Sequence, residues 1–110
     1  MKKHQITNAP QIGNEQVAQI AQKGYKTIIC FCKNDECKHQ PTHAEIEKSC
    51  HQVGIAFKAI PFAASELSHA QVTEFAEYFN QVEHPVYMYC QTGVRAKLIY
   101  QAALVSGLLD

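Results

Sequence analysis

The stretch VYMYCQTGVR, residues 86–95, decides the fold of this 110-residue chain. Its first four residues are apolar or aromatic and predict a buried strand, and residues 96–106 beyond it carry a helical pattern. A tight loop between a strand and a helix leaves the first backbone N–H groups of the helix without partners inside the helix. These N–H groups and the positive end of the helix dipole point at whatever the loop holds. The stretch therefore predicts an anion site at the end of a strand.

Cys90 and Arg95 are the chemically distinctive groups of this loop. The surrounding positive charge stabilises a thiolate at the first position, so we expect Cys90 to act as a nucleophile at neutral pH. Arg95 adds a full charge and a fork of donors that suits phosphate or sulfate oxygens. Gly93 lets the backbone curl around an anion without a Cβ in the way. We assign Gln91, Thr92, Gly93, Val94 and Ala96 to the anion-binding loop, and expect Thr92, Gly93 and Val94 to contribute backbone N–H groups rather than side chains.

Strands and helices alternate through the rest of the chain. Strands are predicted at residues 4–7, 25–32, 55–60 and 86–89. Helices are predicted to begin at the cap Asn14 and after the capping-box residues Thr42 and Ser68. Repeated β-α units predict an α/β fold with a parallel sheet covered on both faces, and such sheets bind ligands beyond the carboxyl ends of their strands. The Cys90 loop lies at that edge, and we interpret residues 1–110 as a single domain.

Apolar positions at helical spacing predict which side of each helix is buried. The second helix is expected to bury Ile46, Cys50 and Val53, and the third to bury Val72, Phe75, Ala76 and Phe79. The last helix is expected to bury Leu98, Ile99, Ala102 and Val105.

The motif Cys-x-x-Gly-x-Arg between a strand and a helix resembles the active loop of cysteine phosphatases and of rhodanese-type sulfurtransferases. Over its full length the chain resembles the bacterial family of beta-lactamase-hydrolase-like phosphatase domains, through residues 6–12, 24–29, 41–46, 60–61 and 90–95. This resemblance implies a three-layer α/β/α fold of the dual-specificity phosphatase type, with a mainly parallel sheet of four strands. It also implies that the strand before Cys90 lies between the first two strands, which brings the loop of residues 33–40 beside Cys90.

The resemblance leaves more than one function open. It implies that Cys90 attacks a phosphate ester and forms a phosphocysteine intermediate. However, four residues separate Cys90 from Arg95, as in rhodanese loops, whereas phosphatase loops are one residue longer. A tighter loop suits a persulfide sulfur, so the alternative is a sulfurtransferase that takes sulfur from a sulfane donor onto Cys90. The chain also has Ala96 where related phosphatases carry Ser or Thr, and Tyr89 where they carry His. A second alternative is therefore a catalytically weak module that binds an anion or a phosphorylated partner.

Acidic and thiol side chains near the loop supply further candidates. A phosphatase uses a general acid to protonate the leaving oxygen, and the candidates are Asp35, Glu36 and Glu66. Cys32 and Cys37 are candidate redox partners of Cys90, either through a reversible disulfide or by accepting a persulfide from it.

Composition limits the partners that we expect. Lys plus Arg and Asp plus Glu each number 10, so the formal net charge is zero and favours neither nucleic acid nor an anionic membrane. No apolar run approaches the length of a membrane span, and no export signal follows the N-terminus. The five cysteines are therefore expected to be reduced thiols in the cytoplasm.

We expect no metal and no cofactor. The spacing of Cys30, Cys32, Cys37, His39 and His43 is irregular and matches no usual zinc-binding pattern. The expected partner is instead an anionic substrate, either a phosphate ester or a sulfane sulfur donor. The sequence gives no indication of the oligomeric state.

Overall fold

The computed structural model describes residues 6–34, 36 and 40–110 of the chain. Within these residues it has four β-strands, four α-helices and one short 3₁₀-helix. The elements are β1 (Ile6–Ala9), α1 (Asn14–Gln22), β2 (Thr27–Cys30), α2 (His43–Gln52), β3 (Ala56–Ala59), the 3₁₀-helix η1 (Ala64–Glu66), α3 (His69–Gln81), β4 (Val86–Tyr89) and α4 (Val94–Val105).

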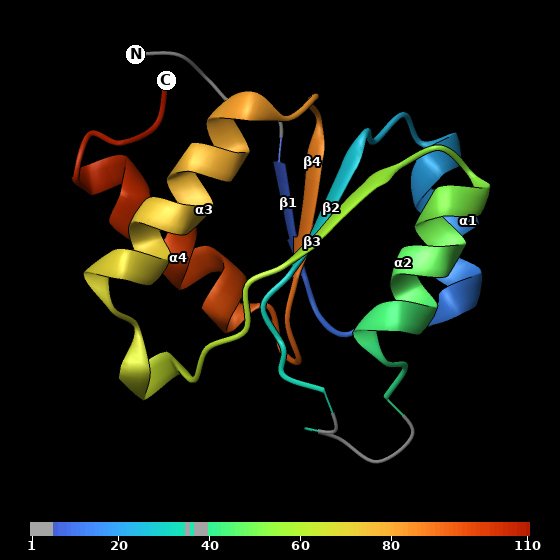
Figure 1. Ribbon diagram of the computed structural model, residues 1–110, viewed down its shortest axis with the longest axis horizontal. Helices are drawn as coiled ribbons and strands as arrows, with labels where there is room; N and C mark the ends of the chain where they lie inside the picture. The colour runs from blue at the N-terminus through green and yellow to red at the C-terminus, as the bar shows by residue number, and fades with distance from the viewer. Residues whose placement is uncertain (1–5, 35, 37–39) are drawn as a thin grey trace.

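The strands form one sheet in the order β1-β4-β2-β3, and every neighbouring pair is parallel. β4 therefore lies between β1 and β2, as the resemblance implies, and Val86 is paired with both Ile6 and Thr27. Helices α1 and α2 cover one face of the sheet, and α3 and α4 cover the other (Figure 1). The predicted three-layer α/β/α fold is confirmed. The carboxyl ends of all the strands meet at one edge, where ligands of parallel sheets bind.

The core is formed where β2 and β4 pass between the two helix layers. All residues of β2 are buried, and Ile28 and Ile29 are completely so. Just beyond β2, the ring of Phe31 meets Phe62 and Phe75 edge to face, with ring centroids 5.9 and 5.8 Å away. These rings fix the chain segments that follow β2 and β3, and those segments surround the Cys90 loop.

The two predicted capping boxes are confirmed. The Thr42 hydroxyl accepts from the N–H of Glu45 at 3.1 Å, and the Glu45 carboxylate accepts from the N–H of Thr42 at 3.0 Å. Ser68 and Gln71 form the same reciprocal pair at the start of α3, at 3.3 and 2.9 Å. The predicted cap of α1 was wrong by one position, because Asn14 is the first helical residue.

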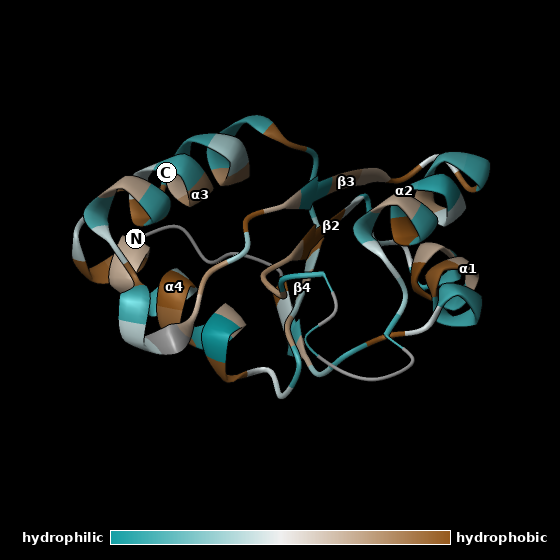
Figure 2. Ribbon diagram, turned by 60° about the horizontal axis from the view of Figure 1, so that its bottom comes forward, coloured by the Kyte–Doolittle hydropathy of each residue, from teal (hydrophilic) through white to brown (hydrophobic). Residues whose placement is uncertain are grey.

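Burial of the helices agrees with prediction in α3 and differs in α2 and α4. All the residues predicted to be buried in α3 are so. Val53 is 40% exposed because it is the C-cap of α2, where the backbone leaves the helix. In α4, Leu98 and Val105 are exposed, and the buried residues are Ala96, Ile99 and Ala103. Apolar residues recur along the whole of α4 (Figure 2), so their pattern singles out no face, and the alanines let the helix approach the sheet closely.

The ends of the strands also differ from prediction. β1 extends two residues beyond the end of the predicted strand 4–7, whose first two residues lie outside the described part of the chain. β2 and β3 are shorter than the predicted strands 25–32 and 55–60. Among the described residues, no helix combines the length and the apolar content that a membrane span needs.

Candidate active site at the Cys90 loop

The Cys90 loop lies at the carboxyl edge of the sheet, between the ends of β1 and β2. The N–H of Cys90 donates to the carbonyl of Ala9, and the N–H of Gln11 donates to the carbonyl of Gln91, both at 3.2 Å. On the other side, the N–H of Phe31 donates to the carbonyl of the last residue of β4 at 2.9 Å. The backbones that follow both neighbouring strands therefore hold the loop in place.

The sulfur of Cys90 lies at the amino end of α4. Its side chain is buried, and the backbone N–H of Gly93 donates to the sulfur across 3.1 Å. Gly93 directly precedes α4 and has a φ of 90°, a left-handed conformation that glycine adopts readily. This turn aims the N–H at the sulfur, and the helix dipole adds partial positive charge at the same end. The arrangement favours the binding of an anion beside the sulfur.

The other residues of the loop differ in exposure. Gln91 and Thr92 are exposed and Val94 is 61% exposed, so the rim of the loop is open to solvent. The hydroxyl of Thr92 accepts from the N–H of Val94 at 3.4 Å. Ala96 is fully buried and presents a methyl group at the position where related phosphatases carry a hydroxyl.

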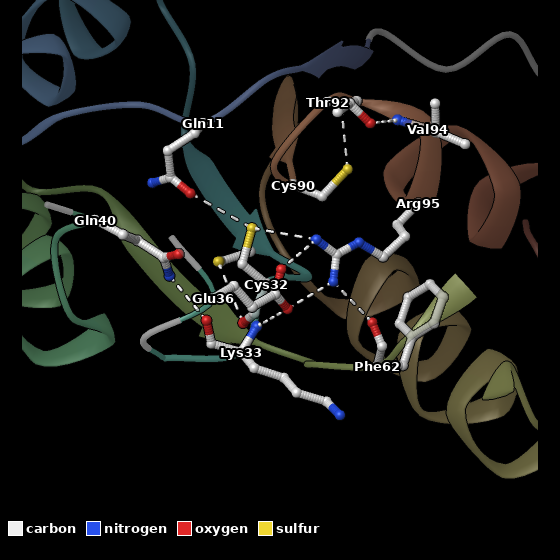
Figure 3. Close-up of polar contacts among 12 residues, drawn as sticks. Gln11, Cys32, Lys33, Glu36, Gln40, Phe62, Cys90, Thr92, Val94 and Arg95 are labelled. Atoms are coloured by element: carbon white, nitrogen blue, oxygen red, sulfur yellow. Dashed lines mark hydrogen bonds and ion pairs between the residues drawn. The ribbon is translucent and has the colours of Figure 1, made fainter. Parts of the chain in front are cut away.

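Arg95 links the Cys90 loop to the loops that follow β2 and β3. Its two terminal nitrogens, Nη1 and Nη2, donate to the two carboxylate oxygens of Glu36 at 2.7 and 2.5 Å (Figure 3). Nη1 also donates to the carbonyl of Phe62 at 3.0 Å, and Nη2 lies 4.0 Å from the sulfur of Cys32. The side chains of Arg95 and Glu36 are only 13% and 16% exposed. The guanidinium is thus held in a partly buried, two-pronged ion pair.

Glu36 is held as a carboxylate by this pairing. The hydrogen bonds from Arg95 lower the pKa of Glu36, and the N–H of Lys33 contributes further by donating to the same carboxylate at 2.6 Å. The same ion pair raises the pKa of Arg95. A carboxylate that is ionised at neutral pH has no proton to give to a leaving group. The role of Glu36 as general acid stays a prediction, and this geometry gives it a different one, as a partner of Arg95.

The structure gives less information on the other two candidate acids. Asp35 lies outside the described residues. Glu66 is exposed at the end of η1, in the loop after β3 whose Phe62 carbonyl contacts Arg95. Both roles stay predictions.

Cys32 lies against the same arginine as Glu36. Its side chain is buried, and its sulfur donates to the side-chain oxygen of Gln11 at 3.5 Å. The ring of His43 bonds the carbonyl of Cys32 at 2.7 Å, which ties the end of β2 to the start of α2. The structure therefore brings Cys32 to the site through Arg95. The other candidate redox partner, Cys37, lies outside the described residues.

The remaining cysteines belong to the core. Cys30 and Cys50 are buried, the second as predicted, and burial raises the pKa of Cys50 to about 12. A hydrogen bond with Cys30, together with burial, raises the pKa of Cys32, so its thiol is protonated at neutral pH.

Of the residues weighed as zinc ligands, His39 lies outside the described part of the chain together with Cys37.

Sequence reasoning missed three groups that shape the site. They are the carbonyls of Ala9 and Phe62 and the side chain of Gln11. Each lies at or just beyond the carboxyl end of β1 or β3, so the strand order is the signal that could have located them. A backbone carbonyl has no residue-type signature, which is why the motif alone does not reveal them.

The sequence of this chain matches a known protein family and two curated relatives. The family described as "Beta-lactamase hydrolase-like protein, phosphatase-like domain" matches residues 2–106. A beta-lactamase hydrolase-like protein of Xylella fastidiosa strain Temecula1 is 23% identical over 90 residues, which cover 82% of this chain and 21% of that protein. The protein of the same name from Agrobacterium fabrum strain C58 is 25% identical over 95 residues, covering 86% of this chain and 22% of that protein. The chain thus spans about a fifth of the length of these curated relatives.

Solved structures agree with this placement. A crystal structure of a candidate phosphatase from Neisseria meningitidis Z2491 superposes with a TM-score of 0.82 at 35% identity, covering 90% of this chain and 70% of that one. A DUF442 candidate phosphatase from Shewanella putrefaciens CN-32 shares the fold, with a TM-score of 0.79 at 18% identity, covering 97% of this chain and 67% of that one. The chain therefore belongs to the family of phosphatase-like domains of beta-lactamase hydrolase-like proteins.

Proposed function

We propose that this phosphatase-like domain is a cysteine-dependent phosphatase that acts on phosphate esters. The observation that carries the proposal is the hydrogen bond from the N–H of Gly93 to the sulfur of Cys90, at the amino end of α4. A backbone donor and a helix dipole directed at one thiol form a cradle for a nucleophilic sulfur and for the oxygens of its substrate. Membership of a phosphatase-like family supports the same chemistry.

The reaction proceeds in two steps. The thiolate of Cys90 attacks phosphorus, so that an S–P bond forms while the P–O bond to the leaving alcohol breaks. Water then attacks phosphorus, the S–P bond breaks, and inorganic phosphate leaves with the thiolate restored. Arg95 and the loop N–H groups stabilise the equatorial oxygens as negative charge develops on them.

The surroundings of Cys90 favour a substrate with a good leaving group. Glu36 is ion-paired with Arg95 and is held as a carboxylate, so it has no proton to give to a leaving oxygen. An aryl phosphate leaves as a stabilised phenolate and needs little help from a general acid. We therefore propose aryl phosphates as the substrate class.

The short loop favours a second candidate, a sulfurtransferase. Four residues lie between Cys90 and Arg95, and a tight loop suits a single terminal sulfur atom. With thiosulfate, the Cys90 thiolate would attack the sulfane sulfur, an S–S bond would form, and sulfite would leave. A thiol acceptor would then take the outer sulfur from the persulfide. A domain that binds anions without turnover is the third candidate, since Ala96 and Tyr89 depart from the phosphatase pattern.

Steady-state hydrolysis of para-nitrophenyl phosphate in mild acid tests the proposal. We expect the native protein to turn over and Cys90→Ser to lose that activity. Cys50→Ala is the matched control, because it removes a core thiol in α2 and should leave the activity intact. Activity that survives Cys90→Ser, or no turnover by the native protein, would contradict the phosphatase reading. Sulfite release from thiosulfate would then support the sulfurtransferase, and anion binding with neither activity would support the binding module.

A further inference from the structure

We propose that Glu36 acts as an internal anion that competes with the substrate for Arg95. The proposal rests on the proposed function, since it concerns how the Cys90 loop acquires its anion. In the resting site the carboxylate of Glu36 occupies the terminal nitrogens of Arg95. Substrate binding then replaces the carboxylate oxygens of Glu36 with those of the bound anion.

A count of hydrogen-bond donors is the first argument. A guanidinium has five N–H groups, two on each terminal nitrogen and one on Nε. The Nη1 nitrogen of Arg95 donates to Glu36 and to the Phe62 carbonyl, and Nη2 donates to Glu36 and faces the sulfur of Cys32. The four terminal N–H groups are therefore matched by four acceptors. Among the described residues, the Nε–H group is the one for which no such acceptor is found, and it is left for an anion in the loop.

The direction of the side chain is the second argument. Figure 3 shows the terminal nitrogens of Arg95 in contact with Glu36, the Phe62 carbonyl and the sulfur of Cys32, and with no drawn contact to the sulfur of Cys90. Arginine grips a phosphate or sulfate through two parallel N–H groups. While Glu36 and the Phe62 carbonyl hold the terminal nitrogens, Arg95 cannot offer the parallel Nη1–H and Nη2–H pair to an anion beside Cys90. Anion binding through that pair therefore requires that the ion pair opens.

Hydrogen bonds from the backbone also fix the position of the Glu36 carboxylate. The carboxylate oxygen that contacts Nη1 also accepts from the N–H of Lys33 at 2.6 Å. Described residues on either side of Glu36 are also held, because Gln40 donates to the carbonyl of Lys33 and Asn34 accepts from the N–H of His43, both at 2.8 Å. Because the pair is partly buried as well as anchored, it competes more strongly than an exposed ion pair would.

Sulfate binding to the native full-length chain tests the competition. Sulfate is a useful probe because it stays a dianion across the working pH range and does not react with the thiol. The backbone amide signals of Gly93 and Val94, followed by NMR during a sulfate titration, report binding at the loop itself. Glu36→Gln keeps the size of the side chain and removes its charge. We expect it to bind sulfate about tenfold more tightly, which is the ratio that a charge-assisted hydrogen bond is worth.

Two further variants make the test specific. Glu47→Gln removes one negative charge from the exposed surface of α2 and should leave sulfate affinity unchanged. Glu36→Asp keeps the charge on a shorter side chain that reaches Arg95 less well, and we expect an affinity between those of native protein and Glu36→Gln. The amide spectrum of each free variant shows whether it is folded, and Glu36→Asp carries the test if Glu36→Gln is not.

The outcomes separate this inference from the proposed function. Unchanged or weaker sulfate binding in Glu36→Gln would overturn the inference and make Glu36 a residue that positions Arg95. If Cys90-dependent hydrolysis is nevertheless present, the proposed function stands. If neither native protein nor Glu36→Gln binds sulfate at the loop, the inference fails, and so does the anion site on which the proposed function depends.

Discussion

The backbone N–H of Gly93 lies 3.1 Å from the sulfur of Cys90, and the left-handed turn at Gly93 is what directs it there. The contact joins a conformation that favours glycine to the proposed nucleophile. A single substitution at Gly93 therefore tests both the backbone strain of the turn and the contribution of its N–H group to catalysis.

Gly93→Ala should lower kcat/KM for an aryl phosphate by more than tenfold. An added Cβ would lie 3.5 Å from the Ala9 carbonyl carbon, which is an ordinary contact, so the strain comes from the φ of +90°. A non-glycine residue in this region costs about 1–2 kcal/mol. The chain can relieve that strain by turning the N–H away from the sulfur. Hydrolysis assays and urea unfolding measure the two effects.

Gly24→Ala is the matched control for this prediction. Gly24 has a φ of +96° with open space around its Cβ position, and it follows α1 rather than the Cys90 loop. We expect a similar loss of unfolding free energy and unchanged activity. An equal loss of activity in both variants would show that stability, not the contact to Cys90, controls the rate.

Arg95→Ala should destabilise the fold by about 2 kcal/mol, because it leaves the partly buried carboxylate of Glu36 unpaired. Adding Glu36→Gln should recover part of the loss, giving a coupling energy of about 1–2 kcal/mol in a double-mutant cycle. Denaturant unfolding gives the free energy of unfolding of Arg95→Ala, of Glu36→Gln and of the double variant. Lys58→Ala is the control, since its ion pair with Glu74 is 3.6 Å long and exposed, and should contribute less than about 1 kcal/mol. Additive effects at Arg95 and Glu36 would contradict the pairing.

Stability should depend on pH through Glu36. Arg95 holds the pKa of this carboxyl below its ordinary value of 4.5. A group whose pKa falls on folding stabilises the folded state above its unfolded pKa, and the contribution is lost as the pH drops through the folded pKa. The difference in unfolding free energy between the native protein and Glu36→Gln should thus be constant above about pH 5.5 and shrink at lower pH. A difference that grows on acidification would refute the assignment.

Ala96→Ser should raise the turnover number for an aryl phosphate several-fold. It places a hydroxyl directly after Arg95, where related phosphatases use one to hydrogen-bond the departing thiolate. The position is fully buried, so we also expect a stability loss of about 1 kcal/mol. Ala103→Ser makes the same change at another buried position of α4 and should lower stability without raising kcat. Equal kcat values for the two variants would contradict the role given to this position.

The sequence was informative wherever a local pattern has one structural solution. The capping boxes at Thr42 and Ser68 and the glycine turn at Gly93 follow from short-range hydrogen bonding and backbone sterics, and they are present as expected. The strand order follows from the family resemblance. Once it is known, β4 lies between β1 and β2, and the loop after β2 is brought to Arg95.

The sequence did not predict features that depend on tertiary packing. Apolar residues recur on all sides of α4, so only packing against the sheet decides that Ala96 and Ala103 are buried and Val105 is exposed. Glu36 was recognised as a candidate general acid near the site, and that role stays a prediction, but its ion pair with Arg95 was not foreseen. Its partner is fixed by the path of a loop, since the N–H of Lys33 and the guanidinium of Arg95 converge on one carboxylate. No residue spacing encodes that convergence.

The most direct test of the central claim is to trap the covalent intermediate. The native protein would be mixed with an aryl phosphate and quenched during turnover, and its peptides would be analysed by mass spectrometry. The account predicts one phosphoryl group on the peptide that carries Cys90, labile to hydrolysis and absent from Cys90→Ser. Turnover without any phosphoryl group on Cys90 at any quench time, or a stable phosphoryl group on another residue, would contradict it.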